Sequence, residues 1–280
     1  MLIRNAMTVD VEDYFQVSAF EGYIDRREWD SFPCRVEHNT DRILALFADS
    51  GVQATFFTLG WVAERYPSLV KRIVAGGHEL ASHGYSHVRV NRQQPAEFRE
   101  DVEKTKKLLE DISGVAVKGY RAASYSIGAD NLWALEELAE AGYVYSSSIY
   151  PIQHDLYGMP EAPRFAFRPR GHDGVLEIPI TTLRVGGKNL ACGGGGFFRL
   201  YPYAISRWAL RRVNQGDGQA GIFYFHPWEI DPGQPRQDGI GIKARIRHYL
   251  NLSRMEPRLK CLLRDFSWDR VDRVFRVADA

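Results

Sequence analysis

The chain has few cysteines and lacks a long apolar run. Its three cysteines, Cys34, Cys192 and Cys261, stand far apart, and no Cys-x-x-Cys pair occurs. This spacing argues against a zinc knuckle or a disulfide framework. No run of about 18 apolar residues is available to cross a bilayer, so we expect no integral membrane segment. The first residues lack the apolar core and cleavage site of a signal peptide, which leads us to expect a cytoplasmic protein.

An excess of charge of either sign is also missing. The 36 basic and 35 acidic residues leave a formal net charge of +1. Without a basic footprint, nucleic acid is not expected as a partner. The sequence does contain 45% hydrophobic and 25% charged residues over 280 positions, which is typical of a globular chain that buries a sizeable core. The oligomeric state is left open, a homo-oligomer included.

Short runs rich in β-forming residues alternate with segments of helical periodicity. Strands are expected at residues 6–10, 54–59, 79–82, 118–121, 143–146, 174–178 and 222–225. Helices are expected at residues 36–49, 62–75, 95–112, 131–141, 202–213 and, with a break near Pro257, 242–266. This alternation favours an α/β fold with a mostly parallel sheet covered by helices, either a barrel or a doubly wound sheet.

The strongest local signal is a pair of histidines four residues apart, His83 and His87. Two side chains at this spacing lie on one side of a helical turn, close enough to share a metal ion. The pair follows the strand expected at 79–82, so it should lie at a carboxyl end, where barrel and open-sheet enzymes place their sites. Taken alone, such a pair is more often a surface turn with two solvated histidines.

Three acidic residues, Asp10, Glu12 and Asp13, end the first expected strand. The two-residue period of a strand places Asp10 and Glu12 on the same face. Carboxylates at such a position are costly unless they are solvated, paired or bound to metal. Taken alone, an ordinary polar strand exit or a helix N-cap explains this segment better than a metal site does.

Two further strand ends carry an arginine and a histidine. Arg121 could pair with a carboxylate and fix its orientation. His226 ends a very apolar strand, where a lone histidine is more often structural. The combination is more informative than any single residue, because the carboxyl ends of parallel strands would bring these groups to one rim.

The order of these segments resembles that of the NodB-type polysaccharide deacetylases, carbohydrate esterase family 4. The Asp10, His83, Arg121 and His226 segments carry the likeness over about residues 1–230. Closer still are the deacetylases of exopolysaccharide gene clusters that accompany the exosortase system. The segments that carry this closer likeness are residues 10–17, 193–200, 224–231 and 247–266.

The resemblance implies a distorted (β/α)7 barrel. It also implies a single polysaccharide deacetylase domain over 1–280, with a core that ends near residue 230 and a C-terminal helical extension over about 231–280. The implied activity is hydrolytic removal of N-acetyl groups from the amino sugars of a polysaccharide or oligosaccharide, in exopolysaccharide biosynthesis.

In such deacetylases a divalent ion, usually zinc, is held by two histidines and one carboxylate, and the histidines here are His83 and His87. The resemblance implies that Asp10 is the general base and that Arg121 tethers it. It implies that His226 is the general acid. The backbone N–H of Ser124 falls where the family places an oxyanion donor.

The carboxylate ligand of the metal is one departure from the family pattern. The family has two adjacent aspartates, of which the second binds metal, whereas Val11 follows Asp10 here. The ligand must then be Glu12 or Asp13. Same-face geometry favours Glu12, and a bulge or tight turn after the strand would deliver Asp13 instead.

Two other departures concern the oxyanion donor and the general acid. Ala122 and Ala123 replace the usual proline, and we expect this change to loosen the loop that presents Ser124. An aspartate that tunes the acid histidine is expected after the fifth strand, but residues 145–148 are Tyr-Ser-Ser-Ser. We therefore expect His226 to be less easily protonated, unless Asp155 or Asp231 substitutes.

Aromatic residues are candidates for substrate binding, because sugar rings stack on apolar faces. The candidates are Tyr14, Phe15, Trp61, Tyr125, Phe197, Phe198 and Trp228. Tyr125 and Trp228 are the two that we place at the substrate, although core packing explains most of the others.

The glycine run at 193–196 lacks a following Lys-Ser or Lys-Thr, so it is not a phosphate loop. We expect it near the substrate groove, with Arg199 as a polar contact, or on the surface as a flexible loop.

Two alternative functions remain at this point. One is a hydrolase of a small-molecule amide on the same fold, which a small closed pocket would favour. The other is a catalytically degenerate glycan-binding protein, which would bind glycan without releasing acetate.

Overall fold

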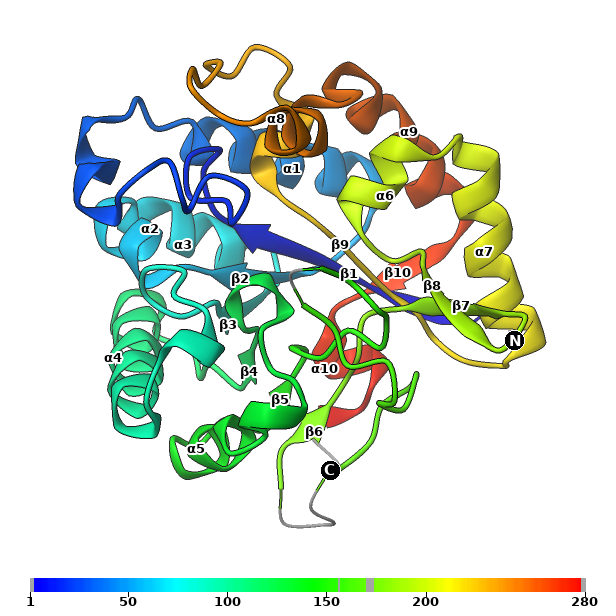
Figure 1. The fold of residues 1–280 in the computed structure, drawn as a ribbon, viewed down its shortest axis with the longest axis horizontal. Coiled ribbons are helices and arrows are strands. Elements are labelled where there is room, and N and C mark those ends of the chain that lie inside the picture. Colours follow the sequence, from blue (N-terminus) through cyan, green and yellow to red (C-terminus); the bar gives the residue numbers. More distant parts are fainter. Residues whose placement is uncertain (1–2, 156, 170–173, 278–280) are drawn as a thin grey trace.

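The computed structural model describes residues 3–155, 157–169 and 174–277, and Figure 1 shows one parallel sheet surrounded by helices. Within these residues the sheet has eight strands. They are β1 (Arg4–Val11), β2 (Thr55–Thr58), β3 (Glu79–Ser82), β4 (Gly119–Tyr120), β5 (Tyr145–Ser146), β6 (Leu176–Glu177), β9 (Ile222–Phe225) and β10 (Ser267–Asp269). The expectation of a parallel α/β sheet is confirmed.

Strand β1 is the centre of the sheet. It pairs with β2 through Thr8–Val11, with β9 through Ala6–Val9 and with β10 through Arg4–Ala6. From β2 the order continues through β3, β4 and β5 to β6. Among the described residues β6 and β9 do not pair, so the curved sheet is an incompletely closed barrel. All carboxyl ends lie at one end of this barrel because every pairing in it is parallel.

The helices cover the outside of the sheet, with α4 and α5 beside β3–β5 and α6 and α7 on the opposite flank (Figure 1). They are α1 (Val36–Ser50), α2 (Gly60–Arg65), α3 (Pro67–Ala75), α4 (Pro95–Ser113), α5 (Ala134–Glu140), α6 (Gly195–Leu200), α7 (Tyr203–Gly216), α8 (Ile242–Tyr249), α9 (Leu252–Asp265) and α10 (Val271–Val274). No helix in the described part of the chain is both long and apolar enough to cross a membrane.

Local sequence marks where the helices begin and end. Pro95 is the first residue of α4, where its missing N–H costs nothing, and the Glu97 carboxylate accepts the backbone N–H of Gln94 at 2.8 Å. The helix ends at Gly114, whose φ of 72° suits glycine. These signals explain why the expected bounds of α4 lie within one residue of the observed ones.

The core fills both faces of the sheet. On β2, Phe56 packs outward against Phe47 of α1, with ring centroids 6.2 Å apart. Phe57 points the other way, into the barrel, where its ring meets that of Tyr145 on β5 at 6.4 Å. Both faces are buried, so consecutive residues of this strand are apolar rather than alternating with polar ones.

Several elements differ from the expectation. The helix expected at 62–75 is divided at Pro67, which begins α3. The expected break near Pro257 is wrong, because that residue lies inside α9 and the chain turns at Asn251, with φ of 53°. Asparagine tolerates this left-handed conformation better than most residues. A hairpin, β7 (Thr182–Val185) with β8 (Lys188–Ala191), and the helix α6 have no counterpart in the prediction.

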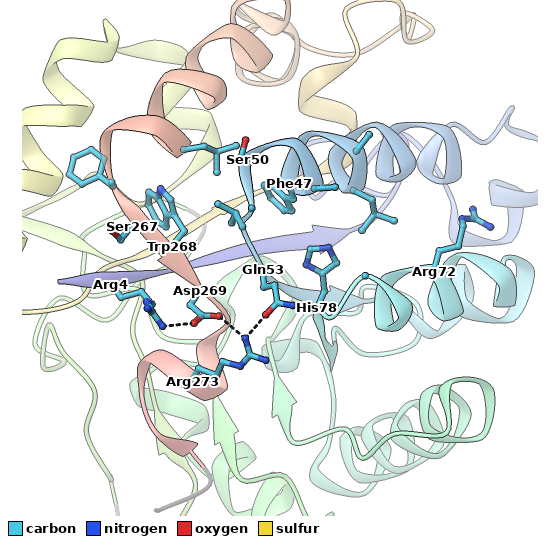
Figure 2. A pocket seen from close by; sticks show the side chains of 18 of the residues that line it. Arg4, Phe47, Ser50, Gln53, Arg72, His78, Ser267, Trp268, Asp269 and Arg273 are labelled. Carbon is cyan, nitrogen blue, oxygen red and sulfur yellow. Dashed lines mark hydrogen bonds and ion pairs between the residues drawn. The ribbon is translucent and has the colours of Figure 1, made fainter. Parts of the chain in front are cut away.

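The amino ends of the strands border a hollow of about 920 Å³, shown in Figure 2. Its charged groups are paired: Arg4 and Arg273 both bind Asp269, at 2.9 and 3.3 Å. His78 accepts the backbone N–H of Ala54 at 3.1 Å, and burial lowers the pKa of its imidazole to about 4. The charged groups of the hollow are therefore neutralised and its histidine is structural. The hollow lies at the end of the barrel opposite the carboxyl ends of the strands.

Glu79 is a buried carboxylate that joins several elements, and it generates a test of the fold. Thr55 on β2 and Tyr145 on β5 donate hydrogen bonds to it at 2.5 and 2.9 Å. Burial raises its pKa to about 7 from an ordinary value of 4.5. Between pH 4.5 and about 7, Glu79 therefore keeps its proton in the folded protein and has lost it in the unfolded chain.

We expect Glu79→Gln to flatten the dependence of stability on pH. The contribution of Glu79 is fully present below pH 4.5 and is lost as pH rises through about 7, so wild-type protein should lose more unfolding free energy between pH 5 and 8 than the variant does. Urea unfolding at both pH values measures this, with the exposed Glu103→Gln as the control. The same loss in wild type and Glu79→Gln would contradict the raised pKa.

Candidate active site

Side chains from the carboxyl ends of four strands meet around one cavity of about 150 Å³. The predicted residues that line it are Asp10, Glu12, His83, His87, Ser124, Tyr125, His226 and Trp228. They follow β1, β3, β4 and β9, as the parallel topology requires. Arg121 lies directly behind Asp10, whereas Asp13 and Arg199 are not among the lining residues.

Glu12, His83 and His87 form a buried group whose ligand atoms all lie within 4.8 Å of one another. A tight turn after β1, in which the N–H of Glu12 donates to the carbonyl of Asp10 at 3.0 Å, delivers the carboxylate. His83 donates from Nδ1 to the carbonyl of Arg121 at 2.8 Å, so its Nε2 lone pair is free for the cavity. The left-handed backbone of His87, with φ of 54°, turns the second imidazole toward the first.

The electrostatics of this group fit a divalent cation. Burial lowers the pKa of His83 to about 4 and that of His87 well below its usual value, so both imidazoles are neutral near pH 7. Burial also raises the pKa of Glu12 to about 7. Its Oε2 lies 3.0 Å from His87 Nε2, yet it accepts no hydrogen bond from a described residue. Two neutral imidazoles and an unsatisfied carboxylate oxygen are suitable ligands for an ion such as zinc.

Asp13, the other carboxylate considered for this role, is engaged elsewhere. Its Oδ2 accepts the backbone N–H groups of Arg35 and Val36 at 2.6 and 2.8 Å. Its Oδ1 accepts the N–H of Tyr14 at 2.8 Å. Val36 is the first residue of α1, so Asp13 satisfies N–H groups that a helix start leaves without partners. The structure therefore brings Glu12, and not Asp13, to the histidines.

Arg121 holds Asp10 in a fully buried pair. Its Nη1 donates to Asp10 Oδ1 at 2.5 Å and to the Thr8 hydroxyl, and its Nε and Nη2 donate to Ser147. The second oxygen of Asp10 faces the cavity, 3.5 Å from the hydroxyl of Tyr125. A carboxylate clamped on one oxygen and open on the other is suited to accept a proton in a defined direction.

His226 has a carboxylate partner that the sequence analysis did not identify. Its Nδ1 lies 3.0 Å from Oε2 of Glu229, three residues later. Asp155 and Asp231, the expected substitutes, bind Lys243 and Arg35 instead. The His-x-x-Glu spacing was the available signal, since residues three apart can meet on one turn.

The expectation that His226 is hard to protonate is therefore wrong. Burial alone would lower its pKa, but the carboxylates of Glu12, Glu229 and Asp10 together outweigh burial and raise it to about 9. Its Nε2 faces the cavity, 3.9 Å from Asp10 Oδ2. The histidine is therefore placed to hold a proton at the edge of the cavity opposite Arg121.

The loop after β4 is buried at its first residues, where the alanines replace the usual proline. Ala122 and Ala123 are buried, and the N–H of Ala122 donates to the Ser148 hydroxyl at 2.9 Å. Ser124 has a left-handed φ of 55° and lines the cavity. Its hydroxyl contacts that of Ser18, another lining residue, which the sequence analysis missed.

Arg199 occupies a different place from the one expected. It is 2% exposed, and its Nε donates to Oε1 of Glu229 at 2.8 Å. Its three guanidinium nitrogens donate hydrogen bonds to Glu229 and to backbone carbonyls, so they are not available to a substrate. Of the aromatic candidates, Trp228 stacks on His226 with ring centroids 5.1 Å apart, whereas Phe15 and Trp61 pack against each other in the core.

Two family models match consecutive parts of the chain. One, described as polysaccharide deacetylase, matches residues 28–146. The other, described as a domain of unknown function, DUF3473, matches residues 147–276. His83, His87 and Arg121 lie in the first match, and His226 lies in the second. Asp10 and Glu12 precede both.

Curated relatives are similar over part of this chain. A peptidoglycan-N-acetylglucosamine deacetylase of Bacillus cereus is 37% identical over 35% of the chain and 36% of that relative. A chitooligosaccharide deacetylase of Bradyrhizobium is 30% identical over 39% of the chain and 49% of that relative. The match thus spans less than half the length of either protein.

Among solved structures, the PuuE allantoinase is similar over 98% of this chain and 89% of its own, with a TM-score of 0.60 and 17% identity. At this identity the likeness concerns the fold alone. The distorted barrel that the family resemblance implies agrees with it.

The different engagements of Glu12 and Asp13 lead to a test of metal binding. We expect Glu12→Gln to weaken zinc binding at least about tenfold, because a ligand with an unsatisfied oxygen is removed. Asp13→Asn should leave zinc affinity unchanged and lower the unfolding free energy by about 1–2 kcal/mol, because the amide NH2 group cannot accept the backbone N–H bonded to one of the two oxygens. Isothermal titration with zinc and thermal unfolding measure the two effects, and the reverse pattern would assign the ligand to Asp13.

Proposed function

We propose that this chain, which belongs to the polysaccharide deacetylase family by its residues 28–146, is a metal-dependent N-deacetylase of amino-sugar glycans. The single observation that carries the proposal is the shared cavity, where Glu12, His83 and His87 stand between Asp10 and His226. A metal group flanked by one carboxylate and one protonated imidazole is what amide hydrolysis needs.

When bound, a divalent ion supplies Lewis-acid polarisation of the acetyl carbonyl and of water. Asp10, held by Arg121 on Oδ1, accepts the proton of the attacking water on Oδ2. His226 donates a proton from Nε2 to the departing amine, which would otherwise be a poor leaving group. The backbone N–H of Ser124 donates to the acetyl oxygen as negative charge develops there.

Zinc is the metal that we propose, because two imidazoles and one carboxylate leave open positions and suit its ligand preference. The substrate that we propose is an N-acetylated polysaccharide or oligosaccharide, with Tyr125 and Trp228 against the sugar. The resemblance of residues 10–17 and 224–231 to deacetylases of exosortase-linked gene clusters supports an exopolysaccharide as the substrate.

We also propose one domain over 1–280, since β10 of the C-terminal extension pairs with β1.

The size of the cavity favours a second candidate, hydrolysis of a small amide. A volume of about 150 Å³ is below the roughly 300–1,000 Å³ of typical ligand pockets. It holds an acetamido group, whereas the remainder of a glycan would have to lie outside it. Turnover of small amides without turnover of N-acetylated oligosaccharides would select this candidate.

The zinc-loaded protein should release acetate from N-acetylated amino-sugar oligosaccharides. Removal of zinc with a chelator should abolish release, and added zinc should restore it. We expect Asp10→Asn to lower kcat about 10²- to 10⁴-fold, the usual contribution of a general base, without changing the zinc content. The melting temperature should fall, because Arg121 is left buried without a counter-charge. Acetate assay and zinc analysis measure this, with the exposed Asp49→Asn as the control. Unchanged turnover of Asp10→Asn would reject the role proposed for Asp10.

A further inference from the structure

The face of His226 remote from the cavity is held by the buried carboxylate of Glu229. Oε2 of Glu229 accepts hydrogen bonds from Nδ1 and from the backbone N–H of His226, both at 3.0 Å. Nδ1 therefore carries a proton, which it donates to Glu229. Nε2, at the other end, faces the cavity, 3.4 Å from Oε1 of Glu12.

The second oxygen of Glu229 is bound by Arg199, which is buried as well. Arg199 Nε donates to Glu229 Oε1 at 2.8 Å. The other nitrogens donate to the carbonyls of Arg247, His248 and Leu250 at 2.6–3.0 Å, where α8 ends. A helix leaves its last carbonyls without internal partners, so a single guanidinium satisfies both these carbonyls and the buried carboxylate.

The glycine run at 193–196 has a physical reason in this arrangement. A Cβ on Gly195 would lie 2.1 Å from Oε2 of Glu229 and 2.7 Å from its Oε1. At Gly196 a Cβ would meet nothing within 4 Å. Gly195 is therefore the position at which a side chain would displace the carboxylate from His226.

Trp228 supports the other side of the imidazole. Its ring stacks on His226 with an interplanar angle of 16°, and on His248 with one of 17°. Its Nε1–H donates to Glu12 Oε1 at 3.3 Å. The histidine is thus held by a hydrogen bond along its ring and by stacking across it.

We propose that Glu229 is the positioning residue of His226. Arg199 holds its carboxylate in place, and the absence of a side chain at Gly195 leaves room for it. The proposal rests on the proposed deacetylase function, in which His226 protonates the departing amine. It gives a defined role to the region 147–276, which matches a domain of unknown function, because that region contributes both the acid and its support. Ser146–Ser148, where the family resemblance implies a carboxylate, contribute none.

The proposal predicts a change of tautomer in Glu229→Gln. The glutamine oxygen should face Arg199, which is charged, buried and has only donors. Its NH2 group should then face Nδ1 of His226, and the backbone N–H of His226 loses its acceptor. Nδ1 must then become an acceptor, and the proton moves to Nε2. Nitrogen NMR of the zinc-loaded protein, selectively labelled in its eight histidines, should show a protonated Nδ1 of His226 in wild type. In Glu229→Gln it should show Nδ1 without a proton and Nε2 protonated. Nδ1–H in both proteins would overturn the proposal.

A second measurement separates positioning from a general structural role. Departure of an amine needs a proton, whereas departure of 4-nitrophenolate from an aryl acetate does not. We expect Glu229→Gln to lower kcat on an N-acetylated oligosaccharide about 10²-fold or more, with KM little changed. The kcat on 4-nitrophenyl acetate should change less than about threefold. Equal losses on both substrates, or no loss on either, would overturn the proposal.

Matched variants distinguish a loss of activity caused by the Glu229 contact from one caused by misfolding. Gly195→Ala should show the same selective loss as Glu229→Gln, because its Cβ displaces the carboxylate. Gly196→Ala should behave like wild type, and Glu79→Gln controls for the removal of a buried carboxylate at the other end of the barrel. If Gly195→Ala and Gly196→Ala have equal activities, the assigned contact is refuted. If wild type releases no acetate, the proposed function fails, and the tautomer of His226 still decides the role of Glu229.

Discussion

Burial of negative charge at the carboxyl ends of the sheet is the constraint on which the site depends. Asp10, Glu12 and Glu229 are all removed from water, and an unpaired buried carboxylate is costly. Arg121 neutralises Asp10 and Arg199 neutralises Glu229. Glu12 has no arginine partner among the described residues. Two neutral imidazoles lie beside it and the Asp10 carboxylate repels it, so this carboxylate is the one that a cation would stabilise.

The parallel sheet explains why these charges can be gathered at all. Each strand contributes its functional group at its last residues, so the topology brings the groups together without requiring them to be neighbours in sequence. The amino ends border the larger hollow shown in Figure 2, but there Asp269 is paired with arginines and His78 is hydrogen-bonded to the backbone. Size alone is therefore a poor guide to the site in this fold.

Elements of regular pattern were predictable, and elements set by long-range contacts were not. The bounds of β3 and β9 agree with those expected, because short apolar runs between polar turns define them locally. The β7–β8 hairpin and β10 carry no comparable pattern. The pairing of β10 with β1 depends on the return of the chain after some 260 residues, which no local periodicity reports.

The sequence by itself determined that His83 and His87 follow one strand, and that Asp10, Arg121 and His226 end strands, since strand ends depend on nearby residues only. The helical turn expected at the histidine pair is wrong, because residues 83–87 are not helical and the left-handed backbone of His87 turns its imidazole toward His83. Tertiary structure alone decided between Glu12 and Asp13, because the competing partners of Asp13 are N–H groups about twenty residues away. It also decided that Arg199 serves Glu229 rather than a substrate. That pairing depends on α6 lying beside the end of β9, which brings a guanidinium and a carboxylate together out of water.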